Sequence, residues 1–387
     1  MLCPIIFVLL FLLPLPTTLA LITIPIHNHA PANTNSRPHQ RPLPNTTATW
    51  PQPGPYSPII PTIPLRIGNP PQTPPLNMYV DLSSSSSVVP SSDCLHQPSP
   101  DHEICAGHNT YARARSRQRE SIPYGGVSFT DLHEVRDRWE VAGCGRSDVS
   151  FVEARRVRYV EGPFDERWDG RLGLGLGGAL EGMGGEQGAS VFGLRLPGEA
   201  EEGELALGGG NEALYDGEVV MHPVVGGSGE GERWAVDLAA YGWDRAESGG
   251  GVDRWRNPDG GACVAEVRSD VQGIHFAKPL WAEDAQNAVE ADERGIPLDC
   301  RDRELMPDLI FTIGEQDLSL TPYEYIVEVR PERNESGEAQ CWMRLHKMSP
   351  DKTDACVVLG QAFLSVFYSI FDTDKKEIGF AKLSNGL

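Results

Sequence analysis

The sequence predicts two domains, or one large domain with two lobes, and it carries clear β-strand patterns at two places. A chain of 387 residues exceeds what a single hydrophobic core usually organises. In Met78–Cys94, an apolar run, a group of serines and a second short apolar run predict a strand, a tight loop and another strand. Residues 121–126 predict a strand that ends in a glycine-containing hairpin tip.

The first 20 residues are predicted to be a signal peptide. An apolar run, Ile5–Leu13, precedes the small-residue cleavage pattern at residues 18–20, although the basic start of a typical signal is missing. A membrane anchor is the alternative, but the run is short and prolines follow it at positions 14 and 16. No later segment is apolar enough to cross a bilayer, so we expect a secreted, extracellular protein without an integral membrane span.

Residues 21–56 are rich in Pro, Asn, Thr and His and show no apolar periodicity, which predicts an extended and mostly disordered N-terminal segment. The chain has two glycosylation sequons, at Asn45 and Asn334, which are typical of a secreted protein. We therefore expect glycosylation at both asparagines.

Cysteine usage fits the same compartment. Apart from Cys3 in the predicted signal there are seven cysteines, which in a secreted protein predict disulfides with one thiol left over. They are Cys94, Cys105, Cys144, Cys263, Cys300, Cys341 and Cys356. No pair of them has the spacing of metal ligands, so we expect no zinc, no other metal and no cofactor.

The formal net charge of −21 argues against nucleic acid as a partner. One basic stretch stands out: Arg113, Arg115, Arg117 and Arg119 recur at every second position. On a strand they would form a ladder on one face. The simpler interpretation is a solvated strand face that balances local acidity, and the alternative is a site for an acidic partner.

The chemistry-bearing residue of the Met78–Cys94 stretch is Asp81. It ends an apolar run, and Ser83–Ser87 follow almost at once. A carboxylate in such a place can be desolvated and surrounded by hydroxyl donors, which is how acid–base carboxyls are tuned. The alternative is a serine-rich linker, which the apolar segments on both sides disfavour.

Three pieces, Ile67–Gln72, Val80-Asp81 and Val89–Cys94, resemble the N-terminal active-site region of pepsin-like aspartic proteases (peptidase A1). That family usually has Asp-Thr-Gly-Ser-Ser at this point, whereas this chain has Leu82 and Ser83 after the aspartate. The resemblance runs from about Tyr56 to the C-terminus. It implies an all-β, bilobal fold of two related β-barrel-like lobes, residues 57–210 and 211–387, with a cleft between them and a β-hairpin flap.

The resemblance also implies roles for other first-lobe residues. Tyr124 and Gly125 match the tip of the flap, although a surface tyrosine beside a turn is the simpler alternative. Ser83 and Ser84 would contact substrate or the catalytic loop, with Ser84 as the hydroxyl that orients the first carboxylate. Residues 169–175 resemble the family's Asp-Gly-Ile-Leu-Gly-Leu, and their glycines would let this strand pass close to the loop carrying Asp81.

In the second lobe the resemblance places an arginine where the second catalytic aspartate belongs. Family members often carry a cysteine five residues before that aspartate, and counting from Cys263 leads to Arg268. Ser269 then matches the Thr/Ser position and Asp270 the glycine. The resemblance implies the disulfides Cys94–Cys105 and Cys300–Cys341. The partners of Cys144, Cys263 and Cys356 stay open.

This replacement matters because aspartic proteolysis needs two carboxyls about 3 Å apart that share one proton. One acts as base on a held water while the other protonates the peptide oxygen, and an arginine can do neither. We expect Arg268 to lower the pKa of Asp81 and to form an ion pair with it across the lobes.

The sequence thus predicts a monomeric, catalytically impaired homologue that binds extended peptides or unfolded protein segments in its cleft. One alternative is an active acid endopeptidase in which Asp270 takes the vacant place beside Asp81. Another is a structural or inhibitor-like secreted protein with an unused cleft.

Overall fold

The computed structural model describes residues 21–28, 60–96, 105, 108–111, 116–118, 123–124, 127–159, 168–178, 190–197, 202–225, 233–244, 253–255, 263–277, 295–329, 339–348 and 355–384. Within these residues the strands form sheets of 14, eight and three strands. Short helical turns connect them: η1 (Ser92–His96), η2 (Glu212–Leu214), η5 (Cys300–Leu305), α2 (Pro322–Tyr325) and α3 (Gln361–Leu364). None of the helices in the described ranges is long and apolar enough to cross a membrane.

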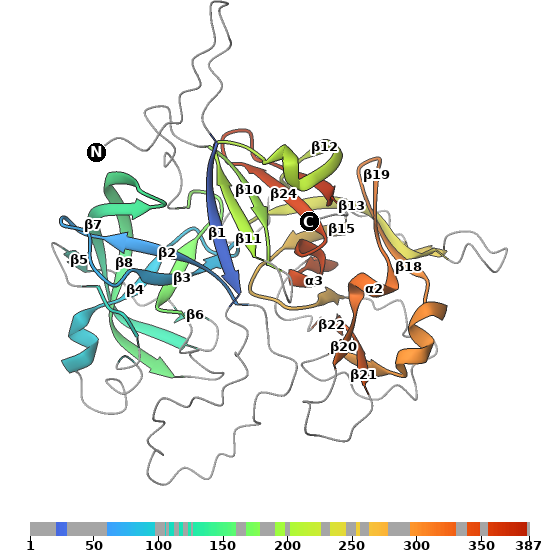
Figure 1. Cartoon of the computed structure of the whole chain (residues 1–387), viewed down its shortest axis with the longest axis horizontal. Helices are drawn as coiled ribbons and strands as arrows, with labels where there is room; N and C mark the ends of the chain where they lie inside the picture. The colour runs from blue at the N-terminus through green and yellow to red at the C-terminus, as the bar shows by residue number, and fades with distance from the viewer. Residues whose placement is uncertain are drawn as a thin grey trace, which may run out of the picture.

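The first half of the chain builds one end of the 14-stranded sheet, on the left of Figure 1. Its strands are β2 (Pro61–Ile67), β3 (Leu76–Asp81), β4 (Val88–Pro90), β5 (Ser116–Gln118), β6 (Pro123–Tyr124), β7 (Val127–Val141), β8 (Cys144–Tyr159) and β9 (Gly170–Gly173). The predicted strand–loop–strand around Asp81 is present as β3 and β4. Leu76, Met78 and Val80 are fully buried, so apolar side chains anchor the strand that carries the aspartate.

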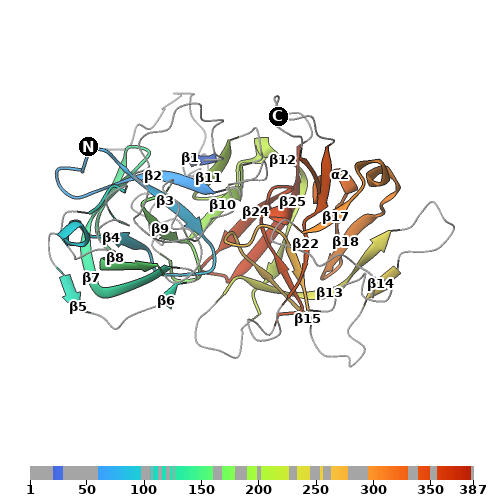
Figure 2. The ribbon, with the colours of Figure 1, turned by 90° about the horizontal axis from the view of Figure 1, so that it is seen from below.

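The other end of the same sheet joins the two halves of the chain. Its strands run in the order β12 (Tyr215–Pro223), β25 (Glu377–Leu383), β24 (Phe367–Asp372), β10 (Val191–Arg195), β11 (Gly203–Leu207) and β1 (Ile22–Asn28). The C-terminal strands β24 and β25 therefore lie beside strands from the middle of the chain, as the red and green ribbons of Figures 1 and 2 show.

Strand β1 corrects one expectation. Residues 22–28 belong to the segment that we expect to be disordered, yet they pair with β11 on one side and with β2 on the other. Ile24 and Ile26 are buried in the core, which stabilises the strand by removing their side chains from water. The remainder of that segment, including Asn45, lies outside the described residues, as do the predicted signal peptide and Asn334.

The second half builds the eight-stranded and three-stranded sheets, coloured from yellow to red-orange on the right of Figure 1. The larger sheet contains β13 (Ala235–Asp244), β14 (Asp253–Trp255), β15 (Cys263–Val267), β16 (Ile274–Phe276), β18 (Asp308–Ile313), β19 (Gln316–Leu320), β22 (Leu345–Lys347) and β23 (Val357–Leu359). The smaller one contains β17 (Ile296–Leu298), β20 (Ile326–Val329) and β21 (Gln340–Met343).

The two halves repeat one local arrangement. In the first, β9 lies between β3, which is parallel to it, and β4, which is antiparallel. In the second, β23 lies between the parallel β15 and the antiparallel β16. A glycine permits the close approach of the loop each time: a Cβ at Gly173 would lie 2.7 Å from the Ser84 carbonyl oxygen, and one at Gly360 would collide with the carbonyl of Val271. The predicted close passage of residues 169–175 is confirmed.

Three disulfides cross-link the residues that the structure describes. Cys94–Cys105 and Cys300–Cys341 are the pairs that the family resemblance implies. The third, Cys263–Cys356, joins the start of β15 to the residue before β23. It therefore links β15, from which the second-lobe loop emerges, to its parallel neighbour β23.

Candidate active site

Asp81 lies at the end of β3, and its side chain is fully buried. Its Oδ1 accepts hydrogen bonds from the Ser83 backbone N–H, at 2.9 Å, and from the Ser83 hydroxyl, at 2.6 Å. The residue that replaces the family's glycine thus donates twice to the carboxylate. The Ser84 hydroxyl donates to the Ser86 carbonyl and accepts from the Ser86 N–H, which closes the serine-rich turn.

The cation beside Asp81 is Arg171, which we did not predict. Arg171 lies on β9, and its Nη1 is 3.5 Å from Asp81 Oδ2. Its guanidinium also lies over the Trp168 ring, 5.9 Å from the centroid. The signal was present in the sequence, because Arg171 stands where the family's Asp-Gly-Ile-Leu-Gly-Leu has an apolar residue.

Arg268 follows β15, and its guanidinium pairs with Asp270. Nε donates to Asp270 Oδ1 at 2.9 Å and Nη2 to Oδ2 at 2.5 Å, so both oxygens of one carboxylate are held. Nη1 lies 4.0 Å from Glu266, which in turn pairs with Arg233. The expected Asp81–Arg268 ion pair is therefore wrong. The carboxylate that Arg268 pairs with is Asp270, two residues further along the same loop.

The pKa values of the two aspartates move in opposite directions. Burial raises the pKa of Asp81, and the negative charge of Asp270 raises it further, against the opposing effects of Arg171 and Ser83. The expected lowering of the Asp81 pKa is wrong for this reason. Burial also acts to raise the pKa of Asp270, but the hydrogen bonds and charge of Arg268, with the charge of Arg171, outweigh it and leave that pKa lowered.

Hydrogen bonds join the two loops across the lobes. The Ser269 hydroxyl donates to the Val80 carbonyl at 2.8 Å and accepts from the Leu82 N–H at 2.9 Å. Leu82 carries no hydroxyl, so its side chain cannot return this bond. Two other side chains contribute instead, since the Tyr79 hydroxyl and the Gln361 amide each donate to the Ser269 carbonyl at 2.7 Å.

The predicted flap hairpin is present in the backbone. Strand β6 pairs with the start of β7, with Tyr124 opposite Val127 and Pro123 opposite Ser128. Gly125, at the tip, lies outside the described residues. Substrate contacts from Tyr124 and Gly125 therefore stay predictions.

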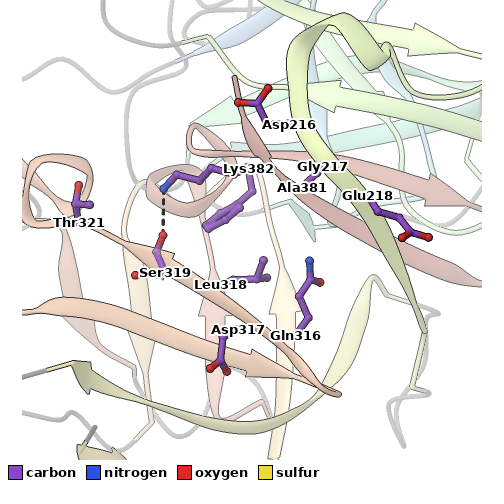
Figure 3. Close-up of a pocket in the computed structure, with 11 residues that line it drawn as sticks. Asp216, Gly217, Glu218, Gln316, Asp317, Leu318, Ser319, Thr321, Ala381 and Lys382 are labelled. Carbon is purple, nitrogen blue, oxygen red and sulfur yellow. Dashed lines mark hydrogen bonds between the residues drawn. The ribbon is translucent and has the colours of Figure 1, made fainter. Parts of the chain in front are cut away.

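Two surface pockets lie elsewhere. One, of about 400 Å³, lies between β12 and β19 and has Leu318 and Phe367 in its lining; Figure 3 shows the Lys382 ammonium reaching Ser319 at its edge. The other, of about 590 Å³, surrounds residues 297–300 and 339–342. Neither is lined by Asp81, Arg171, Arg268 or Asp270. Among the described residues no three His, Cys, Asp or Glu side chains gather as a metal ion's ligands would.

The fold and the two facing loops define a class, the bilobal aspartic-protease-like proteins. Residues 62–383 match the family of eukaryotic aspartyl proteases, and the chain belongs to this family.

Individual relatives agree with the family match. The chain is 28% identical to vacuolar protease A of Neurospora crassa, over 82% of this chain and 77% of that protein. It is 27% identical to gastricsin of Cavia porcellus, over 82% and 78%. The crystal structure of the aspartic proteinase from Irpex lacteus has the same fold, with a TM-score of 0.61 and 18% identity, over 84% of this chain and 94% of that one.

Proposed function

We propose that this family member is a secreted protein that binds extended peptides in its cleft and has impaired peptide hydrolysis. One observation carries the proposal: the two aspartates that could form the catalytic pair are each held by a guanidinium. Asp270 is held by Arg268 and Asp81 by Arg171.

The chemistry explains why this arrangement impairs hydrolysis. A catalytic water must contact two carboxyls that share one proton. Both oxygens of Asp270 accept from Arg268, and the Asp81 side chain has no solvent-exposed surface for a water to contact. Freeing Asp270 would leave a charge in a partly buried place without its partner, which is unfavourable.

Secretion is supported by the chain's chemistry at two places. The three disulfides are typical of an oxidising compartment. Strand β1 begins at Ile22, so cleavage after Ala20 would release the predicted signal peptide and leave that strand complete.

Peptide binding is supported by the family and by the β6–β7 hairpin. The test uses the full secreted chain in two assays: cleavage of an unfolded protein at acidic pH, and calorimetric binding of a statine-containing peptide. We expect binding without cleavage. Asp81→Asn serves as the control, since cleavage that it abolishes would contradict the proposal, and absence of binding would favour the structural or inhibitor-like alternative.

One observation favours a second candidate function, acid endopeptidase activity that uses Asp81 with Asp270. Two neighbouring acids whose pKa values are pushed apart are the arrangement that assigns one as acid and the other as base. In this candidate Asp81 holds the proton and Asp270 is the base. Cleavage abolished by Asp81→Asn and by Asp270→Asn, but not by Gln316→Ala at a distant site, would establish it.

A further inference from the structure

We propose that Arg171 is a positioning residue that covers the Asp81 carboxylate and makes it inaccessible. This effect is independent of Arg268. This inference deepens the proposed function and rests on it, because it divides the loss of hydrolysis between two separate residues. In the second lobe the aspartate itself is replaced, whereas in the first lobe the aspartate is kept and Arg171 stands in place of an apolar residue of the family motif.

Geometry places Arg171 against the free side of the Asp81 carboxylate. Ser83 occupies Oδ1, and Arg171 Nη1 lies 3.5 Å from Oδ2. Only 13% of the Arg171 side chain is exposed, and none of the Asp81 side chain is. The guanidinium therefore lies at the one carboxylate oxygen that Ser83 leaves open.

An aromatic cluster fixes Arg171 in this position. Trp168 and Tyr79 pack together with Ile60, with ring centroids of the two aromatics 5.9 Å apart. The Arg171 guanidinium lies over the Trp168 ring, a contact that is favourable for a cation. The Tyr79 hydroxyl is itself fixed by its hydrogen bond to the Ser269 carbonyl. Since these neighbours are buried, the guanidinium has little room to turn away from Asp81.

The partners of the two arginines show that the blocks are separable. Arg268 contacts Asp270 and Glu266, whereas Arg171 contacts Asp81. Arg171 lies on β9, whereas Arg268 directly follows β15, and these two strands belong to different sheets. Removing the guanidinium of Arg268 therefore leaves Arg171 in contact with Asp81. Even if an aspartate were restored at position 268, the Asp81 carboxyl would still be covered by Arg171.

Chemical labelling tests this directly. The folded chain is treated with a water-soluble carbodiimide and an amine nucleophile, and modification of Asp81 is quantified by peptide mass spectrometry. We expect wild-type Asp81 to be protected and Arg171→Ala to raise its modification about tenfold, the factor that loss of one hydrogen bond to a charged group produces. Arg268→Ala, the matched control, should leave Asp81 protected. The inference would be overturned if Asp81 were modified equally in wild type and Arg171→Ala. It would also be overturned if Arg171→Ala and Arg268→Ala raised the modification of Asp81 equally.

A second measurement does not depend on the alanine variant folding. Arg171→Met keeps most of the side-chain volume, and the ¹³C chemical shift of the Asp81 carboxyl, assigned by its loss in Asp81→Asn, reports its titration. Removing the nearby cation should raise the Asp81 midpoint, and Arg171→Lys should restore it. An unchanged midpoint in Arg171→Met would refute the role of Arg171. Cleavage of substrate by the wild type would instead contradict the proposed function, so the two failures are distinguishable.

Discussion

The loops that follow β3 and β15 occupy equivalent places, yet they carry opposite electrostatics. The first loop presents a buried acid whose pKa is raised. The second presents an arginine paired with an acid whose pKa is lowered, and both of these side chains are partly exposed, at 29% and 22%. The shared strand arrangement therefore fixes where the loops lie, while the side chains alone decide what chemistry they can do.

The comparison also shows which features the fold requires. Gly173 and Gly360 let each loop approach its neighbouring strand, and both are present although the catalytic motif is altered beside them. Ser269 keeps the hydrogen bonds to the first loop. The close glycine approaches and the hydrogen bonds of Ser269 are therefore present at loops whose catalytic motif differs from the family's.

The largest effect should come from restoring the family's residues around both loops, and it should be seen in the rate of peptide cleavage. The double variant Arg268→Asp/Asp270→Gly restores the family motif in the second lobe, and adding Arg171→Ile opens the first. We expect the triple variant to cleave an unfolded protein at acidic pH at least about a hundredfold faster than the double variant, the lower range of general acid–base catalysis. Fluorogenic peptide cleavage measures this. Equal rates for the two variants would mean that Arg171 does not restrict the first loop.

The link between the loops should be the next most sensitive feature. Ser269→Ala removes a donor and an acceptor at once and leaves the Leu82 N–H and the Val80 carbonyl buried without this partner. We expect the free energy of unfolding to fall by about 3 kcal/mol. Urea denaturation measures it, with Ser365→Ala as the matched control, because the Ser365 hydroxyl makes only one long bond of 3.4 Å to a local carbonyl. If Ser269→Ala and Ser365→Ala lowered the free energy of unfolding by similar amounts, the hydrogen bonds of Ser269 between the loops would have no special role in stability.

The Arg268–Asp270 pair should contribute less, because both side chains reach solvent. Arg268→Met leaves Asp270 without its partner, and we expect a loss of about 2 kcal/mol at neutral pH, below the cost of breaking a fully buried pair. The double variant Arg268→Met/Asp270→Asn removes the stranded charge and should recover most of the loss. Thermal unfolding of the wild type, Arg268→Met, Asp270→Asn and the double variant forms a double-mutant cycle, and a coupling near zero would contradict the importance of the pair.

The sequence predicts much of the fold but only half of the site. The apolar residues around Asp81 carry a local signal for strand β3, and the family resemblance implies the disulfides Cys94–Cys105 and Cys300–Cys341; the strand and both disulfides are confirmed. Strand β1 has alternating isoleucines, but Pro25 and the surrounding composition obscure them, and its partner β11 is far along the chain.

The ion pairs depend on side-chain directions that spacing does not reveal. Arg268 could reach either aspartate from its position in the chain, and it pairs with Asp270 in its own loop. Arg171 meets Asp81 only because β9 lies parallel to β3. The disulfide Cys263–Cys356 likewise follows from the parallel pairing of β15 with β23, which is a tertiary feature.

Stability against pH should separate the two aspartates by sign. Because the folded pKa of Asp81 is raised, its ionisation destabilises the fold as pH rises through that pKa, and Asp81→Asn lacks this penalty. The free energy of unfolding of Asp81→Asn, relative to wild type, should therefore increase from acidic to neutral pH. Asp270 behaves in the opposite way, because its folded pKa is lowered and its contribution is lost as pH falls through that pKa. Relative to wild type, Asp270→Asn should become less stable over the same interval. Urea unfolding of the three proteins at several pH values measures both slopes, and slopes of the same sign would refute the opposite electrostatics of the two loops.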